Sequence, residues 1–177
     1  MNQLSRAPVI HSFAPVADSK AQILILGSMP GVESLRTGRY YAHPRNAFWR
    51  IMGDLIGASA DLPYATRTLK LRQSGISLWD VLAACVRPGS LDAAIDERTI
   101  IANDLITFLA QHANIRHVFF NGAAAERLFQ RHVAPALEAG ALQMQRLPST
   151  SPAHAAMSYD KKLQEWRGIL RALKITK

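Results

Sequence analysis

Short apolar runs alternate with helical segments along this chain, and the alternation leaves few folds open. The first run, QILILG at residues 22–27, is aliphatic and ends in a glycine, which is typical of a buried parallel strand that leads into a loop. Similar runs recur at residues 76–81, 118–120 and 142–147. Because each later run follows a segment with helical apolar spacing, the pattern predicts parallel strands joined by helices.

The same periodicity predicts helices at residues 47–56, 64–74, 99–112, 123–133 and 159–173. Crossover helices cover both faces of a parallel sheet, so the predicted fold class is α/β, a three-layer α/β/α arrangement around a central four-stranded, mostly parallel sheet. The 177 residues, 49% of them hydrophobic, suit a single domain over residues 1–177. Residues 1–20 are expected to form an N-terminal arm or a loose terminus.

The charge of the chain favours a polyanionic partner. Its 21 lysines and arginines outnumber its 13 acidic residues, so the formal net charge is +8. Each phosphate that a basic side chain neutralises releases condensed counterions, which strengthens binding to nucleic acid. The alternative is a basic surface that is merely well solvated. Nucleic acid is therefore the favoured partner.

Membrane-bound and metal-dependent classes are disfavoured. No apolar run approaches the ~20 residues that a membrane span needs, and the first residues lack the apolar stretch of a secretory signal, so a soluble cytoplasmic protein is expected. Cys85 is the only cysteine, which excludes an intrachain disulfide, a cysteine-based zinc site and an iron–sulfur cluster. The six histidines lack the paired spacing of a metal site, so no metal or other cofactor is expected.

The loop after the first strand, residues 28–46, is long for a strand-to-helix connection and reads SMPGVESLRTGRYYAHPRN. Its glycines allow the backbone to approach a ligand closely, its aromatic rings can stack on a base, and its arginines can contact phosphates. Core packing is the alternative for Tyr40, Phe48 and Trp49. The GxxxxGK[ST] spacing of a phosphate loop and the GxSxG spacing of a serine nucleophile elbow are both absent.

A second candidate loop, LPSTSPAHAAMS at residues 147–158, follows the last strand. Its hydroxyls and backbone amides can grip phosphates around a flipped nucleotide, and the segment after Pro152 can enter the vacated base stack. The alternative is an ordinary serine-proline turn that leads to a helix capped by Ser158.

Taken together, the two loops resemble those of the uracil-DNA glycosylase superfamily. GSMPG followed by AHPRNAFW resembles the first motif of the mismatch-specific uracil-DNA glycosylases, GISLWDVL before RPGS resembles their second strand, VFFNGAAA their third strand and helix, and LPSTSPAH their final motif. The resemblance spans residues 22–173. In the first and last motifs the chain is most similar to the hypoxanthine-DNA (deoxyinosine) glycosylases.

The resemblance implies an enzyme that flips a deaminated base out of double-stranded DNA and hydrolyses its N-glycosidic bond, leaving an abasic site. Hypoxanthine is the expected base, with uracil and xanthine as alternatives. We expect a monomer that associates with cytoplasmic DNA. A monofunctional enzyme is expected because neither motif loop contains a lysine for a Schiff-base lyase step.

Met29 departs from the family pattern, because the mismatch-specific enzymes carry a catalytic asparagine within GxNPG and this chain has methionine there. Asn46 of HPRNAFW is the expected substitute, since a carboxamide can orient a water without ionising. The alternative is that Asn46 only caps the helix expected from Ala47. Because of Met29, a noncatalytic DNA- or nucleotide-binding module of the same fold remains an alternative.

Asp80 ends the second strand, where uracil enzymes place an asparagine that reads the base edge. An ionised Asp80 would accept from the N1–H of hypoxanthine, a protonated Asp80 could donate, and a turn cap is the structural alternative. Asn121 is expected to cap the following helix. The expected site residues are Asn46 and Ser149 for catalysis; Gly27, Ser28, Met29, Phe48 and Asp80 for the base; and Arg45, Thr150, Ser151 and His154 for DNA.

Overall fold

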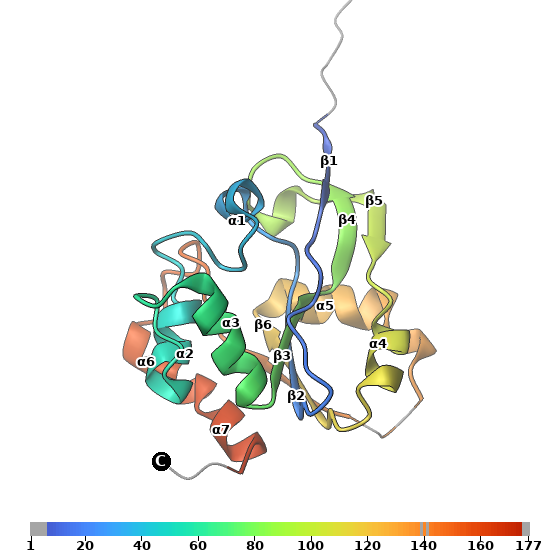
Figure 1. The fold of residues 1–177 in the computed structure, drawn as a ribbon. Coiled ribbons are helices and arrows are strands. Elements are labelled where there is room, and N and C mark those ends of the chain that lie inside the picture. The colour runs from blue at the N-terminus through green and yellow to red at the C-terminus, as the bar shows by residue number, and fades with distance from the viewer. Residues whose placement is uncertain (1–6, 139, 141, 175–177) are drawn as a thin grey trace, which may run out of the picture.

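Four parallel strands form the central sheet, in the order β3-β2-β6-β7 (Figure 1). The structure is a computed structural model that describes residues 7–138, 140 and 142–174. The strands are β2 (Ile23–Gly27), β3 (Ile76–Asp80), β6 (His117–Asn121) and β7 (Gln143–Leu147). All five residues of β2 are buried, which explains why it appears in the sequence as an unbroken apolar run.

Two hydrophobic clusters lie on opposite faces of this sheet, because successive side chains of a strand point to opposite sides. Ile23 and Ile25 belong to one cluster, and Leu24 and Leu26 belong to the other. The first cluster is covered by α2 (Phe48–Ile56), α3 (Tyr64–Gln73), α6 (Tyr159–Trp166) and α7 (Gly168–Ala172). The second is covered by α4 (Leu105–Gln111) and α5 (Ala123–His132). The predicted three-layer α/β/α fold is therefore confirmed.

A second, antiparallel sheet was not predicted. It consists of β1 (Val9–His11), β4 (Leu82–Val86) and β5 (Asp96–Ala102), in the order β1-β4-β5. The helix predicted over residues 99–112 is therefore wrong in its first part, and α4 begins only at Leu105. The β-branched residues before Asn103 pair with β4, and the Asp104 carboxylate caps α4 by accepting from Thr107 N at 3.0 Å.

The described part of the N-terminal arm packs against both sheets, whereas residues 1–6 lie outside the described residues. Strand β1 pairs with β4, Val16 forms a bridge with Leu78, and the Trp79 indole N–H donates to Phe13 O at 2.9 Å. A short helical turn, η2 (Ala134–Ala136), follows α5. No helix within residues 7–138 and 142–174 is long and apolar enough to cross a membrane.

The C-terminal helix predicted over residues 159–173 is two helices. Helix α6 ends at Trp166 and α7 begins at Gly168. A Cβ on buried Gly168 would lie 3.4 Å from Arg171 Nη2 and 3.6 Å from Gln145 Oε1, which are ordinary van der Waals distances, so packing against β7 does not require a glycine here. Glycine weakens the continuity of a helix.

Candidate active site

A cavity of about 150 Å³ lies beyond the carboxyl ends of the parallel strands. Open α/β sheets place ligand sites at this edge because the loops converge there. The last residues of β2, β3 and β6, namely Gly27, Asp80 and Asn121, form its floor, and loop residues form its walls. Of the predicted site residues, the cavity is lined by Gly27, Ser28, Met29, Asn46, Asp80, Ser149, Thr150 and Ser151.

Three predicted residues do not line this cavity. Arg45 and His154 are exposed, and Arg45 borders a neighbouring groove that shares Asn46 with the cavity. Phe48 is 0% exposed and packs among the aromatic rings below the cavity floor. Arg45 and His154 can still contact a larger ligand that extends beyond the cavity, whereas buried Phe48 cannot.

Asp80 is the buried titratable group at the floor of the cavity. Its Oδ2 atom is enclosed and has no hydrogen-bond partner among the described residues. Burial and, to a smaller extent, the nearby Asp92 carboxyl raise the pKa of Asp80 to about 8, although Arg87 opposes the shift. The carboxyl is therefore mostly protonated at neutral pH, and it offers one donor and one acceptor to a ligand.

Gly27 leaves room for the Asp80 carboxyl. A Cβ at position 27 would lie 2.5 Å from Asp80 Oδ1 and 3.0 Å from the Tyr41 hydroxyl. Any side chain here would therefore displace one of these two groups. This close approach, rather than a positive φ, explains the glycine at the end of β2.

Tyr41 lines the cavity, where Phe48 was predicted to stack on a base. Its ring stacks on Phe48 with 4.1 Å between centroids and an interplanar angle of 23°. The prediction that Phe48 stacks on the base is therefore not met, because Tyr41 already covers the Phe48 ring and itself lines the cavity. Tyr41 has a φ of 53°, which residues other than glycine rarely adopt. Burial raises the pKa of its hydroxyl.

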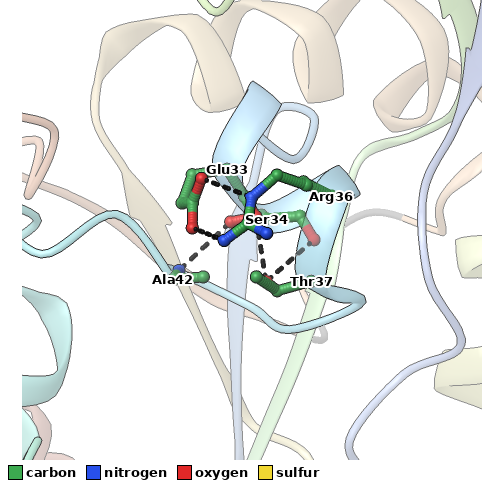
Figure 2. A network of polar contacts seen from close by, with 5 residues as sticks. All are labelled: Glu33, Ser34, Arg36, Thr37 and Ala42. Carbon is green, nitrogen blue, oxygen red and sulfur yellow. Dashed lines mark hydrogen bonds and ion pairs between the residues drawn. The ribbon is translucent and has the colours of Figure 1, made fainter.

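Helix α1 (Val32–Thr37) fixes the segment that carries Tyr41 (Figure 2). Ser34 is buried in this helix, and its hydroxyl accepts from Ala42 N at 3.2 Å. Glu33 and Arg36 form a two-pronged ion pair on the same helix, with distances of 3.0 and 2.7 Å. Although this exposed ion pair adds little stability, the Ser34 contact ties α1 to the cavity wall.

Arg87 anchors the first loop, residues 28–46, through backbone carbonyls. Its side chain is fully buried, and its guanidinium donates to Met29 O at 3.3 Å, to Pro30 O and to Gly89 O at 3.0 Å. Asp92 lies 3.7 Å from this guanidinium and accepts from the Ser28 hydroxyl at 2.8 Å. One buried cation thus satisfies several loop carbonyls, which makes the GSMPG backbone rigid.

Asn46 lines the cavity and also contacts the start of α2. Its Oδ1 accepts from Phe48 N at 3.0 Å, so the capping alternative describes a real contact, although α2 begins at Phe48 rather than Ala47. The carbonyl oxygen has a second lone pair, and the amide group adds donors. His43 also lines the cavity, and its Nδ1 accepts from Arg45 N at 3.1 Å.

Asn121 joins the third strand to the fourth loop. Its amide nitrogen donates to Thr150 Oγ1 at 2.9 Å, and its Oδ1 accepts from Thr150 N at 2.9 Å. The predicted cap role is wrong, because Gly122 is the N-cap of α5. Thr150 is buried and its hydroxyl points to Asn121, so this side chain links loops instead of contacting phosphates; its carbonyl accepts from Ala47 N at 3.0 Å.

Two side chains from α6 anchor the same loop. The Trp166 indole N–H donates to Pro148 O at 2.9 Å, and buried Lys162 donates from Nζ to His154 O at 2.8 Å. Between these anchors, Ser149 Oγ accepts from Ser151 N at 3.2 Å, so the Ser149 hydroxyl proton can be donated elsewhere. The loop is a fixed wall of the cavity that carries the Ser149 hydroxyl.

Sequence reasoning missed several residues that build this site, namely Tyr41, His43, Arg87, Asp92 and Asn121. Two signals were available in the sequence. Tyr41 and His43 stand in the YYAHPRN segment that was already singled out, and Asn121 ends a predicted strand at the functional edge. Arg87 had no comparable signal, because an arginine in an RPGS turn is normally exposed.

Comparison with known proteins finds relatives that match most of this chain. A family model described as the Uracil DNA glycosylase superfamily matches residues 14–174. A curated protein named hypoxanthine DNA glycosylase, from Methanosarcina acetivorans, is 35% identical over 160 residues, which cover 90% of this chain and 96% of that protein. A protein of the same name from Methanosarcina barkeri is 40% identical over 111 residues, which cover 62% of this chain and 69% of that protein.

The structural comparison agrees with the sequence comparison. A solution NMR structure from Methanosarcina acetivorans, of a protein provisionally described as a uracil DNA glycosylase, has a TM-score of 0.77 and 32% identity. The similarity covers 94% of this chain and 99% of that one. The family match over residues 14–174 extends across the strands and loops that form the cavity. The chain belongs to the uracil DNA glycosylase superfamily.

Proposed function

We propose that this protein is a monofunctional DNA glycosylase that releases hypoxanthine from deoxyinosine in double-stranded DNA and leaves an abasic site. The observation that carries the proposal is the buried Asp80 carboxyl, which has a free Oδ2 at the floor of the cavity and a pKa raised to about 8. The names of the two curated relatives support hypoxanthine as the base.

Protonated Asp80 matches the edge of a deaminated base. Hypoxanthine presents an N–H beside a carbonyl, so a carboxylic acid can accept from the first and donate to the second. Adenine presents an amino group beside an unprotonated ring nitrogen, and a carboxylic acid can pair with it only by exchanging the two roles. The fixed surroundings of Asp80 then decide which arrangement is favoured, and we infer that they favour the deaminated edge.

Hydrolysis requires a water positioned at the anomeric carbon once the base has been extruded. Extrusion costs least for weakly paired bases, and the cavity replaces the lost stacking partner with the Tyr41 ring. Asn46 can accept from the attacking water through the lone pair that Phe48 N–H leaves free. Positive charge develops on the sugar as the bond loosens, and Ser149 can hold the neighbouring phosphate in place.

A base-release assay tests this function. We expect single-turnover release of hypoxanthine from an inosine duplex to exceed release of uracil from a matched duplex by about tenfold or more. Uracil presents the same N–H and carbonyl edge to Asp80, so the preference comes from size, because the flexible Met29 side chain in the cavity wall can yield space to a purine. Preference for uracil would contradict the choice of base. Binding without release of either base would instead support the noncatalytic module that Met29 left open.

Binding to undamaged duplex should depend strongly on salt. The net charge of +8 implies contacts with several phosphates, which exposed side chains such as Arg45 can provide. We expect affinity to fall by at least about tenfold between 50 and 200 mM salt, because log K falls by ~0.9 for each phosphate neutralised per tenfold rise in salt. Fluorescence anisotropy with a labelled duplex measures this, and a flat profile would refute DNA binding through a basic surface.

A further inference from the structure

We propose that the Tyr64 hydroxyl is a positioning group for base recognition: it holds the backbone of Tyr40, so that the next residue, Tyr41, presents its ring to the extruded base. This inference rests on the proposed function. Tyr64 is the first residue of α3 and does not line the cavity, so the predicted site did not include it. Its effect on the base would pass through the backbone of the first loop.

The backbone conformation of Tyr41 has to be held in place by its surroundings. Its φ of 53° lies in the left-handed region, and strained residues of this kind persist only where the surrounding structure fixes them. Within the part of the chain that the structure describes, Lys174 is the one other non-glycine residue with a positive φ, and it follows the last helix. The strain at the cavity is therefore concentrated in the residue whose ring covers Phe48 and lines the cavity.

Side chains from three helices hold the two residues that flank this strained position. The Tyr40 N–H donates to the Tyr64 hydroxyl of α3 at 3.1 Å, and the Trp49 indole N–H of α2 donates to Tyr40 O at 2.8 Å. On the other flank, Ala42 N donates to the Ser34 hydroxyl of α1 at 3.2 Å. Both backbone groups of Tyr40 thus depend on side chains rather than on a strand or helix ladder.

The Tyr64 ring is fixed independently of its hydroxyl. It packs edge-to-face on Trp49, with 5.9 Å between centroids and an interplanar angle of 88°. The guanidinium carbons of Arg39 and Arg67 lie 5.8 and 5.4 Å from its centroid. Phenylalanine at position 64 would keep these contacts and lose only the acceptor for Tyr40 N. Because Tyr40 is 3% exposed, its N–H would then be buried without that partner, which favours a shift of the segment.

The positioning role predicts a defect in base release without a defect in DNA binding. We expect Tyr64→Phe to lower single-turnover release of hypoxanthine from an inosine duplex by about tenfold, because stacking on an aromatic ring contributes much of the affinity for an unstacked base. Affinity for undamaged duplex, in which no base is extruded, should stay within about twofold of wild type. Release with enzyme in excess and fluorescence anisotropy measure the two quantities.

A double-mutant cycle tests whether Tyr64 acts through Tyr41. If it does, Tyr64→Phe should slow release by about tenfold in the wild-type background but by less than about twofold in the Tyr41→Ala background, since the ring to be positioned is already gone. A purely structural role would give the same loss in both backgrounds. Equal losses would therefore overturn the positioning role, and so would unchanged release by Tyr64→Phe alone.

Thr68→Val is the matched control, because it also removes a hydroxyl from α3 and lies outside the cavity. The Thr68 hydroxyl donates to Ala65 O at 3.0 Å within the helix. This variant should release hypoxanthine at the wild-type rate, and thermal unfolding of both variants reports their stability. If Thr68→Val slows release as much as Tyr64→Phe does, weakening of α3 explains the loss and the positioning role is wrong, while wild-type activity still upholds the proposed function. If wild type releases no base, the proposed function fails, and the positioning role fails with it.

Discussion

Replacing Asn46 with alanine is expected to slow single-turnover release of hypoxanthine by about 100-fold or more, while affinity for duplex DNA changes little. The carboxamide lies in the wall of the cavity, where its free lone pair can orient the attacking water. That contact is made in the transition state, so its removal should lower the rate of the chemical step rather than the strength of binding. Quenched-flow measurements with enzyme in excess separate these two effects.

The same substitution also removes a contact with the start of α2, so a structural loss must be distinguished from a chemical one. Losing the bond from Phe48 N to Asn46 Oδ1 should cost about 1 kcal/mol of unfolding free energy. Asp104→Ala is the control, since it removes the cap of α4 and lies outside the cavity. If both variants lose stability and both keep activity within a few-fold, Asn46 acts only as a cap.

The second large effect concerns pH. We expect hypoxanthine release by the wild type to fall by roughly 50-fold between pH 8 and pH 10, because the protonated fraction of a carboxyl falls about tenfold per pH unit above its pKa. Burial raises the pKa of Asp80 to about 8, and only the protonated form both donates to and accepts from the base. Asp80→Asn keeps a donor and an acceptor without titrating.

Asp80→Asn should therefore retain much of the activity at neutral pH and lose less of it at high pH. Titration of the base itself affects both proteins equally and cancels in the ratio of their rates. Parallel profiles for the two proteins would show that Asp80 ionisation does not control recognition. A loss of activity in the wild type below pH 8 would contradict the role of the protonated form.

Stability measurements check the same carboxyl without any substrate. Because the folded-state pKa of about 8 lies above the unfolded value of ~3.9, the stability that the protonated form contributes is complete below the unfolded pKa and is lost as pH rises through the folded one. The unfolding free energy of the wild type should fall relative to Asp80→Asn as the pH rises from about pH 4 to about pH 8. Above that range the difference should stay constant.

Strands β2, β3 and β6 of the main sheet could be predicted from sequence because they are largely buried and appear as apolar runs, whereas the edge strand β7 is mostly exposed. The second sheet could not. Its residues 96–102 contain isoleucines at spacings that continue into α4, so periodicity alone joined a strand to a helix. Pairing with β4 makes residues 96–102 a strand, because tertiary contacts of this kind override local propensity.

For the candidate site, the residue types could be predicted from the sequence, but the contacts between them could not. Residue type and position identified Asp80 and Asn46 as polar groups at the functional edge, where the structure places both. The choice of Phe48 over Tyr41 failed because both rings stand in one short segment, and their order of stacking depends on the positive φ of Tyr41. The burial of Arg87 depends on carbonyl groups from a distant loop, which no local pattern records.

The anchoring of the fourth loop by α6 also bears on when the protein gains activity during its synthesis. All four strands of the central sheet precede this loop in the chain, but Lys162 and Trp166 follow it. While α6 is still inside the ribosome, the carbonyls of Pro148 and His154 lack these donors, and the wall that carries Ser149 is held only by contacts such as those of Thr150 with Asn121 and Ala47. A nascent chain can therefore pair all four strands before its fourth loop is anchored, but a chain whose translation stops within this loop also lacks the α6 and α7 side chains that cover one face of the sheet.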